Sequence, residues 1–170
     1  HMDWNLSDPD GSKSVYLLLK NSQGEVSQCI SASIVLDQIP PSLQVNAGPE
    51  LMTATKNASF KLAASDENSG IDKIYCRLGD ESTFSECPTE FSKNDLTEGT
   101  HSMNLYVTDK AGNSSSPVAY SWLVDLSAPT VQIVPPLVTG VIYMNSASIS
   151  FQGADTGGSG LKSFKCTLNN

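Results

Sequence analysis

The chain repeats itself at a spacing of 88 residues, and this repeat limits the folds that it can adopt. Residues 10–45 align with residues 98–133 without a gap. Residues 58–78 align with residues 147–168 at a spacing of 89, which becomes 90 after one extra glycine. The first alignment pairs Gly24 with Gly112, Asp37 with Asp125, and Pro41 with Pro129. A fixed period of this length indicates successive copies of one structural unit.

Within each copy, one set of apolar residues recurs at every second position. Val15, Leu17 and Leu19 alternate with Tyr16, Leu18 and Lys20, and Met103, Leu105 and Val107 repeat the pattern. Alternation of period two predicts a strand with one buried face. A polar loop containing glycine follows, and then a second alternating stretch, at 30–36 and at 118–124. The sequence therefore predicts two equivalent hairpins, and segments 58–78 and 147–168 each predict a strand, an acidic turn and a strand.

The repeated unit has 88 to 90 residues, about seven short strands and no helical period. That combination predicts an all-β fold of immunoglobulin-like β-sandwich repeats in tandem. We expect residues 38–126 to form one complete repeat. Residues 3–37 correspond to the C-terminal half of a preceding repeat, and residues 127–170 to the N-terminal half of a following one.

Several phrases resemble a known family. The segments IYCRLGDESTFSEC, LTEGTHSMNLYVTDKAGNSSSP and YSWLVDLSAPTV look like the bacterial Ig-like repeats of large secreted and cell-surface proteins of the adhesin type. The segment from Asp8 to Pro41 resembles a sister subtype, although Asn21 and Glu25 replace the Asp and Asn of its "D-AGN" turn. The resemblance implies the fold, the tandem arrangement and an extracellular or bacterial cell-surface location. It does not imply a ligand, because a fold does not fix a function.

The four cysteines bear on the compartment. Cys76 and Cys87 flank ten residues, which is compatible with a redox or metal pair and, more readily, with a structural disulfide. Closing so short a loop contributes about 3 kcal/mol in the chain-entropy model, and a disulfide implies an oxidising compartment. The sequence leaves the pairing of Cys29 and Cys166 open.

Charge and histidine content narrow the function classes. The net charge of −8 disfavours nucleic acid as a partner. No apolar run reaches the roughly 20 residues needed to cross a bilayer. His1 and Met2 look like the remainder of an expression tag, which leaves His101 as the one native histidine. We therefore predict no catalytic residues and expect that the chain is not an enzyme.

Aspartates recur at turns and junctions, and two interpretations stay open for them. Carboxylate and carbonyl oxygens could hold Ca²⁺ and stiffen the chain. Alternatively, the aspartates accept backbone N–H bonds within turns, as Asp and Asn commonly do. The candidate metal ligands are Asp37, Asp66, Asp109 and Asp125. No other cofactor is predicted.

Among the aromatic residues, Trp122 falls on the inward face of its predicted strand and is expected in the core. Tyr106 falls on the outward face and is the one candidate ligand contact.

The leading hypothesis is a non-catalytic stalk, spacer or adhesive array, in which each repeat contacts mainly its neighbours. The alternatives are a module that binds a cell-surface glycan or a host protein, and an accessory domain of a secreted hydrolase. A further expectation concerns the two half-repeats, each of which alone leaves hydrophobic faces and sheet edges open. Residues 127–170 of one chain could complete residues 3–37 of another, as in domain swapping. The alternative is that the sequence is a window on a longer chain, and that its terminal halves are not a native state.

Overall fold

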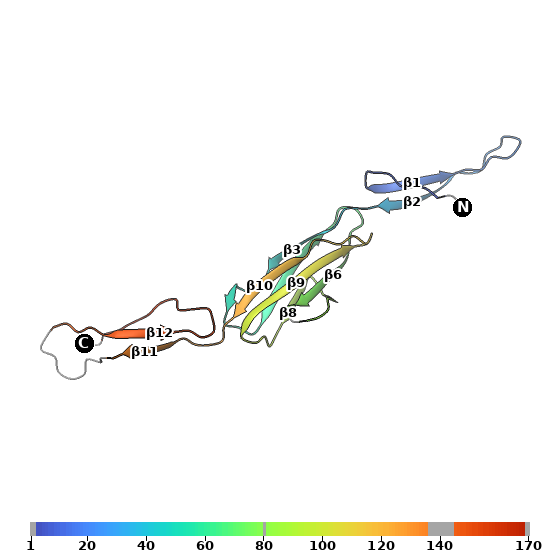
Figure 1. Cartoon of the computed structure of the whole chain (residues 1–170). Helices are drawn as coiled ribbons and strands as arrows, with labels where there is room; N and C mark the ends of the chain where they lie inside the picture. The colour runs from blue at the N-terminus through green and yellow to red at the C-terminus, as the bar shows by residue number, and fades with distance from the viewer. Residues whose placement is uncertain (1–2, 80, 136–144, 169–170) are drawn as a thin grey trace. The chain divides into compact units, whose positions relative to one another are not determined.

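A computed structural model describes residues 3–79, 81–135 and 145–168, so that the last predicted segment, 127–170, is described in part. The described residues form strands and connecting loops, with no helix among them. The prediction of an all-β fold is thereby confirmed. The strands, drawn in Figure 1, are β1 (Gly11–Leu17), β2 (Ile30–Leu36), β3 (Ser42–Ala47), β4 (Met52–Thr53), β5 (Ala58–Ser65), β6 (Ile71–Leu78), β7 (Ser85–Glu86), β8 (Glu90–Lys93), β9 (Gly99–Asp109), β10 (Val118–Val124), β11 (Thr130–Val134) and β12 (Ser150–Ala154).

The strands form four sheets. Two are the isolated pairs β1–β2 and β11–β12, and the others have the orders β4-β10-β9-β6-β7 and β3-β5-β8. The pairs β1–β2, β3–β5, β6–β7, β6–β9 and β11–β12 are antiparallel, whereas the short pair β4–β10 is parallel. Several such sheets with alternating buried residues are consistent with a β-sandwich. Strand β9 shows the predicted alternation, because Met103, Leu105 and Val107 are buried while the residues between them are partly exposed.

The chain divides into two compact units. The first comprises residues 1–47, 60–91 and 103–120, and the second comprises residues 48–59, 92–102 and 121–170. These units do not follow the repeat boundaries predicted at 37/38 and 126/127, which stay a prediction.

The core of the first unit lies between residues of β3 and β5 on one side and β6, β9 and β10 on the other. The Phe60 ring on β5 meets the Tyr120 ring on β10 edge to face, with 5.7 Å between the ring centroids. In the second unit, Trp122 is buried as predicted, and the His101 ring stacks on it at 5.6 Å.

The β1–β2 hairpin reproduces the bonding of the β9–β10 hairpin. The Leu19 N–H donates to Ser27 Oγ at 2.9 Å, and the equivalent Val107 N–H donates to Ser115 Oγ at 3.1 Å. The ladder of the first hairpin pairs Leu17 with Ile30. The two hairpins therefore share their turn geometry as well as their sequence.

The first turn departs from the "D-AGN" pattern in sequence, but it keeps the hydrogen bonds of the equivalent turn between β9 and β10. Asn21 Oδ1 accepts from the Gln23 and Glu25 N–H groups, as Asp109 Oδ1 does from Ala111 and Asn113. The amide-to-carboxylate bond also survives with its ends exchanged. Asn21 Nδ2 donates to Glu25 Oε2 at 2.8 Å, and Asn113 Nδ2 donates to Asp109 Oδ2 at 2.8 Å.

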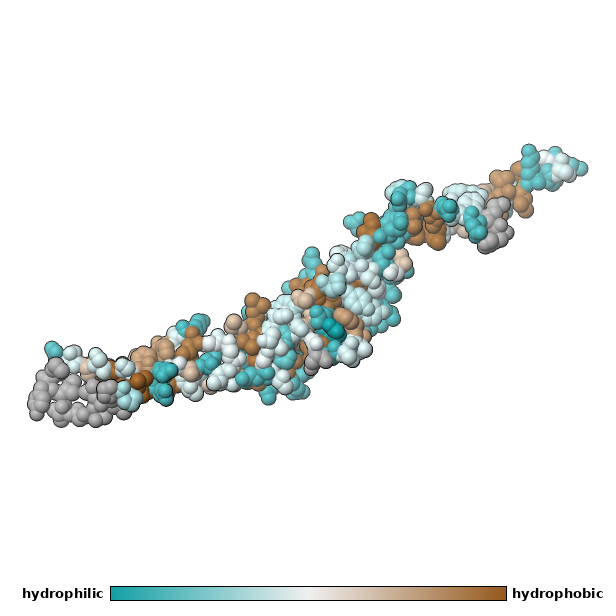
Figure 2. Space-filling model, viewed as in Figure 1, coloured by the Kyte–Doolittle hydropathy of each residue, from teal (hydrophilic) through white to brown (hydrophobic). Residues whose placement is uncertain are grey.

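The predicted buried face of the β1–β2 hairpin is open. Leu17, Leu19 and Ile34 are exposed, and Figure 2 shows hydrophobic side chains at the surface of both isolated hairpins. The buried face that alternation alone predicts is therefore not found in this hairpin, whereas the expectation that a half-repeat leaves a hydrophobic face open agrees with the exposure of these residues. The physical reason is that a strand pair buries a face only against a second layer, and the described residues supply none here.

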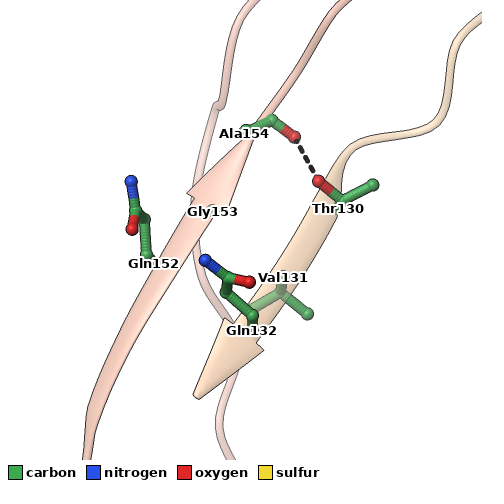
Figure 3. A pocket seen from close by; sticks show the side chains of 6 residues that line it. All are labelled: Thr130, Val131, Gln132, Gln152, Gly153 and Ala154. Carbon is green, nitrogen blue, oxygen red and sulfur yellow. Dashed lines mark hydrogen bonds between the residues drawn. The ribbon is translucent and has the colours of Figure 1, made fainter. Parts of the chain in front are cut away.

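The β11–β12 pair reproduces the first four residue pairs of β3–β5, and the two differ beyond them because β3–β5 shifts register after Val45. Val131 lies opposite Gly153 and Ile133 opposite Phe151, as Leu43 lies opposite Ala64 and Val45 opposite Leu62. Even a side-chain bond recurs. Thr130 Oγ1 donates to the Ala154 carbonyl at 3.3 Å (Figure 3), and Ser42 Oγ donates to the Ser65 carbonyl at 3.3 Å.

One predicted strand is missing. The segment equivalent to β6, residues 161–168, has no strand conformation. In the first unit, β6 is held by β9 and β7. No described strand takes the place of β9 beside residues 161–168, and an extended segment without a hydrogen-bonding partner does not form a ladder.

Candidate functional site

Three of the four predicted metal-ligand candidates lie together in the first unit. Asp37 follows β2, Asp66 follows β5 and Asp109 ends β9. One carboxylate oxygen from each lies within 4.8 Å of the others. Asp37 and Asp109 are buried, and Asp66 is half-buried. We call these three residues the aspartate cluster. The fourth candidate, Asp125, belongs to the second unit.

The Asp37 carboxylate binds both the turn after β2 and the Ser-Gly turn after β5. Its Oδ1 accepts from the Ile39 N–H at 3.1 Å, and its Oδ2 accepts from the Ser69 N–H at 3.0 Å. The Ser69 side chain beside the carboxylate lowers the pKa of Asp37 most, burial opposes that effect, and the two N–H bonds lower the pKa further. The Ser69 hydroxyl has no hydrogen-bond partner among the described residues, so Ser69 binds the carboxylate through its backbone N–H.

Asp109 organises the turn between β9 and β10. Its Oδ1 accepts from the Ala111 and Asn113 N–H groups at 2.9 and 2.8 Å. The Asn113 side chain then donates both to Asp109 Oδ2 and, at 3.1 Å, to the carbonyl of Asp37. A side chain in one turn therefore binds the carboxylate of that turn and the backbone of another.

Asp66 is the least satisfied member of the cluster. Its Oδ1 accepts from the Asn68 and Gly70 N–H groups at 3.2 and 2.7 Å. Its Oδ2 is buried and has no hydrogen-bond partner among the described residues. Gly70 has a φ of +80°, a conformation that favours glycine and brings its N–H onto the carboxylate.

The donor set fits a hard cation such as Ca²⁺, which binds carboxylate oxygens and tolerates irregular geometry. Turn chemistry also accounts for much of the site, because five of the six carboxylate oxygens accept hydrogen bonds. The oxygen that turn chemistry leaves unexplained is Asp66 Oδ2. Both interpretations of the aspartates therefore stay open.

Asp125 repeats the arrangement of Asp37 in the second unit. Its Oδ1 accepts from the Ser127 N–H at 3.0 Å and its Oδ2 from the Ser159 N–H at 2.9 Å. Ser159 lowers the pKa of Asp125 through its side chain and its backbone N–H, and burial acts in the opposite direction. The turn carboxylate is Asp155, which accepts from the Gly160 N–H at 2.7 Å.

Gly157 permits this second arrangement. A Cβ atom at position 157 would overlap the Asp125 carboxylate, which accepts from Ser127 and Ser159, so a larger residue there would displace that carboxylate. Gly157 lies in the stretch between Asp155 and Ser159 where the second alignment shifts from 89 to 90.

A further carboxylate accepts a backbone hydrogen bond from the residue after Asp37, and another does so from the residue after Asp125. The sequence analysis did not identify these two acidic residues. Asp10 Oδ2 accepts from the Gln38 N–H at 3.0 Å, and Glu98 Oε2 accepts from the Leu126 N–H at 3.2 Å. Both pairs are related by the spacing of 88. The signal that could have found them is an acidic residue at the same place in both copies.

The Cys76–Cys87 disulfide is present as predicted, with Cα atoms 5.9 Å apart. It joins β6 to the residue that follows β7. Cys29 and Cys166 are free and exposed.

Tyr106, the candidate ligand contact, is half-buried within an aromatic group formed by β6, β9 and the residue before β7. Its ring stacks on Tyr75 with centroids 4.8 Å apart and meets the Phe84 ring edge-on at 5.0 Å. The Arg77 guanidinium lies 5.0 Å from the centroid of the Phe84 ring. This group combines ring faces with a positive charge on the outer side of the sheet.

No protein-family model matches the chain, and no curated protein matches it. Within the described residues, the structure has no helix of the length and apolar character that a membrane crossing requires.

Proposed function

We propose that this chain is a non-catalytic segment of tandem immunoglobulin-like repeats from a large bacterial surface protein. In this proposal the segment acts as a stalk or spacer, or as part of an adhesive array, outside the cell. The observation that carries the proposal is the recurrence of the same ladder registers and turn bonds at a spacing of about 88 residues.

The junctions support a role in holding successive repeats together. At each one an aspartate accepts from the backbone two residues later and from a Ser-Gly turn about 32 to 34 residues later. A second carboxylate caps the residue that follows the aspartate. Several hydrogen bonds at one junction restrict its dihedral angles more than a flexible Gly-Ser linker would.

The disulfide supports an extracellular location. Structural disulfides persist in oxidising compartments and are rare in the cytosol. The acidic surface suits an exposed position in which self-association through nonspecific contacts is disfavoured.

A binding screen tests the spacer proposal. We expect no saturable binding when the 170-residue chain is presented at micromolar concentration to a glycan array and to purified extracellular-matrix proteins. Saturable binding to one ligand would replace the spacer by a recognition module.

The aromatic group around Tyr106 favours that recognition module as the second candidate. Stacked rings and a guanidinium suit the apolar faces and hydroxyl edges of a glycan. If the screen finds a ligand, Tyr106→Ala should abolish binding, whereas Phe60→Leu in the core should leave binding intact.

A further inference from the structure

We infer that the parallel strand pair β4–β10 is the force-bearing element of the second unit, and that it resists tension along the chain through shear of its hydrogen bonds. The inference deepens the proposed function and rests on it, because a stalk or an adhesive array transmits tension between the structures that it joins. The two strands and the backbone groups that bond them belong to the second unit.

The β4–β10 pair is parallel and is joined by two backbone hydrogen bonds. The Leu123 N–H donates to the Leu51 carbonyl at 2.9 Å. The Asp125 N–H donates to the Thr53 carbonyl, also at 2.9 Å. Alternate residues of β10 therefore bond to alternate residues at β4, with the even spacing of a parallel ladder.

The direction of the two strands decides how tension acts on them. The chain enters β4 at the N-terminal end of that strand, and it leaves β10 at the C-terminal end. Because the strands are parallel, these two points lie at opposite ends of the pair. Tension therefore pulls the strands past each other and loads both hydrogen bonds at once. In an antiparallel pair the same two points would lie side by side, and the bonds would open one after another.

The core holds β10, whereas β4 is held mainly by the two bonds. Trp122 and Val124 on β10 are buried. Leu51 is 71% exposed and Met52 is 60% exposed, so burial of apolar surface contributes little to holding β4. The attachment of β4 therefore depends on hydrogen bonds, and the strength of a hydrogen bond depends on its direction.

The segment after β4 is fixed as well, so that β4 is not released from its C-terminal side. The Leu96 N–H donates to the Lys56 carbonyl at 2.9 Å, and Leu96 is buried. The Thr55 N–H donates to Thr53 Oγ1 at 3.3 Å. Tension that enters from the N-terminal side must therefore break the β4–β10 bonds before it reaches Lys56.

Asp125 connects the pair to the segment that follows it. The Asp125 N–H donates to Thr53, and the Asp125 carboxylate accepts from the Ser127 and Ser159 N–H groups. The last bond of the pair and the first bonds of the following segment therefore meet at one residue. Tension from that segment consequently arrives at the end of the pair itself.

Moving the points at which the molecule is pulled tests the direction of loading. In a Cys29→Ser and Cys166→Ser background, Ala128→Cys supplies one attachment point, after β10. The second attachment point is Glu50→Cys, before β4, or Lys56→Cys, after β4. All three positions are exposed and belong to the second unit. Attachment at 50 and 128 pulls the strands past each other, whereas attachment at 56 and 128 pulls their C-terminal ends apart.

Single-molecule stretching measures the unfolding force for both attachments at one pulling speed. We expect the force to be about twofold higher with attachment at 50 and 128, because two bonds share the load there and one bond at a time bears it in the other case. The two proteins should have the same thermal midpoint, since each attachment point replaces an exposed side chain. Equal forces, or a lower force with attachment at 50 and 128, would overturn the inference.

A proline in β10 provides a second test. Leu123→Pro removes the N–H that donates to the Leu51 carbonyl and leaves the Asp125 bond in place. With attachment at 50 and 128, it should lower the unfolding force by about half, because one of the two bonds is lost. The matched control is Phe91→Ala, which removes a ring that stacks on Phe60 at 5.3 Å, outside the pair. This control should lower the thermal midpoint and reduce the force less than Leu123→Pro does.

An equal loss of force in Leu123→Pro and Phe91→Ala would contradict the role of the pair. If the proline variant does not fold, the two attachments still decide, because neither of them changes a residue of the pair. Saturable binding in the screen would replace the spacer proposal and leave the measured forces as they are. Equal forces would remove the force-bearing role of β4–β10 without producing a ligand, so the two proposals can fail separately.

Discussion

The side-chain amide of Asn113 donates to the backbone carbonyl of Asp37, 76 residues earlier, at 3.1 Å. The same amide donates to Asp109 Oδ2 at 2.8 Å. Asn113 therefore joins the turn after β9 to the segment that follows β2. The group that joins them is its side-chain NH₂, which only donates hydrogen bonds.

Asn113→Ala should lower the free energy of unfolding by about 2 kcal/mol, because it leaves the buried carboxylate of Asp109 and the carbonyl of Asp37 short of a donor. Chemical denaturation followed by tryptophan fluorescence measures the change. The matched control is Glu25→Ala at the equivalent, exposed position of the first hairpin, which should cost less than about 0.5 kcal/mol. Equal losses in the two variants would contradict the role assigned to Asn113.

Asp37 should make stability depend on pH in the acid range. Its pKa is lowered in the folded chain, chiefly by Ser69, so its contribution is fully present above the ordinary carboxyl value of about 4 and is lost as the pH falls through the lower folded value. We expect the free energy of unfolding to fall more steeply between about pH 5 and about pH 3 in the unmodified chain than in Asp37→Asn. Denaturant titrations across this range measure the slopes, and identical slopes would show that Asp37 is not responsible.

The sequence was sufficient for the period, the all-β class, the hairpins and the disulfide, because each follows from local spacing. It also brought out Asp37, Asp66 and Asp109 as candidates. It could not show that these three meet while Asp125 lies elsewhere, since that depends on contacts between residues 29 to 72 positions apart. The burial of Leu17 and the strand at 161–168 were wrongly predicted for a related reason. An alternating pattern shows that one face of a strand needs an apolar layer to pack against. It does not show which segment supplies that layer, because the segment comes from another part of a chain.

Asp66→Asn separates the two interpretations of the aspartate cluster. An Asn retains the oxygen that accepts from Asn68 and Gly70, and its amide replaces the unpartnered Oδ2 beside two other carboxylates. In the presence of a chelator, the variant should be more stable than the unmodified chain by about 1 kcal/mol, because like charges are removed and a donor is gained.

Calcium provides the second arm of that experiment. If the cluster only organises turns, millimolar Ca²⁺ leaves the order of the two thermal midpoints unchanged. If it holds Ca²⁺, the ion stabilises the unmodified chain by mass action and the order reverses. Differential scanning calorimetry of both proteins, each with chelator and with Ca²⁺, shows which of the two has the higher thermal midpoint under each condition. Asp72→Asn, an exposed change outside the cluster, controls for general charge effects.

The Cys76–Cys87 disulfide should shorten the chain that is released when the protein is stretched. The bridge removes a loop with a sequence separation of 11 from the extensible contour. Reduction, or Cys76→Ser with Cys87→Ser, should lengthen the contour gain on unfolding by about 35 Å at about 3.5 Å per residue. It should also lower stability by about 3 kcal/mol. Single-molecule stretching measures the length, and Cys29→Ser with Cys166→Ser is the control that should change neither quantity. An unchanged contour gain after reduction would mean that the bridged loop lies outside the part of the chain that resists force.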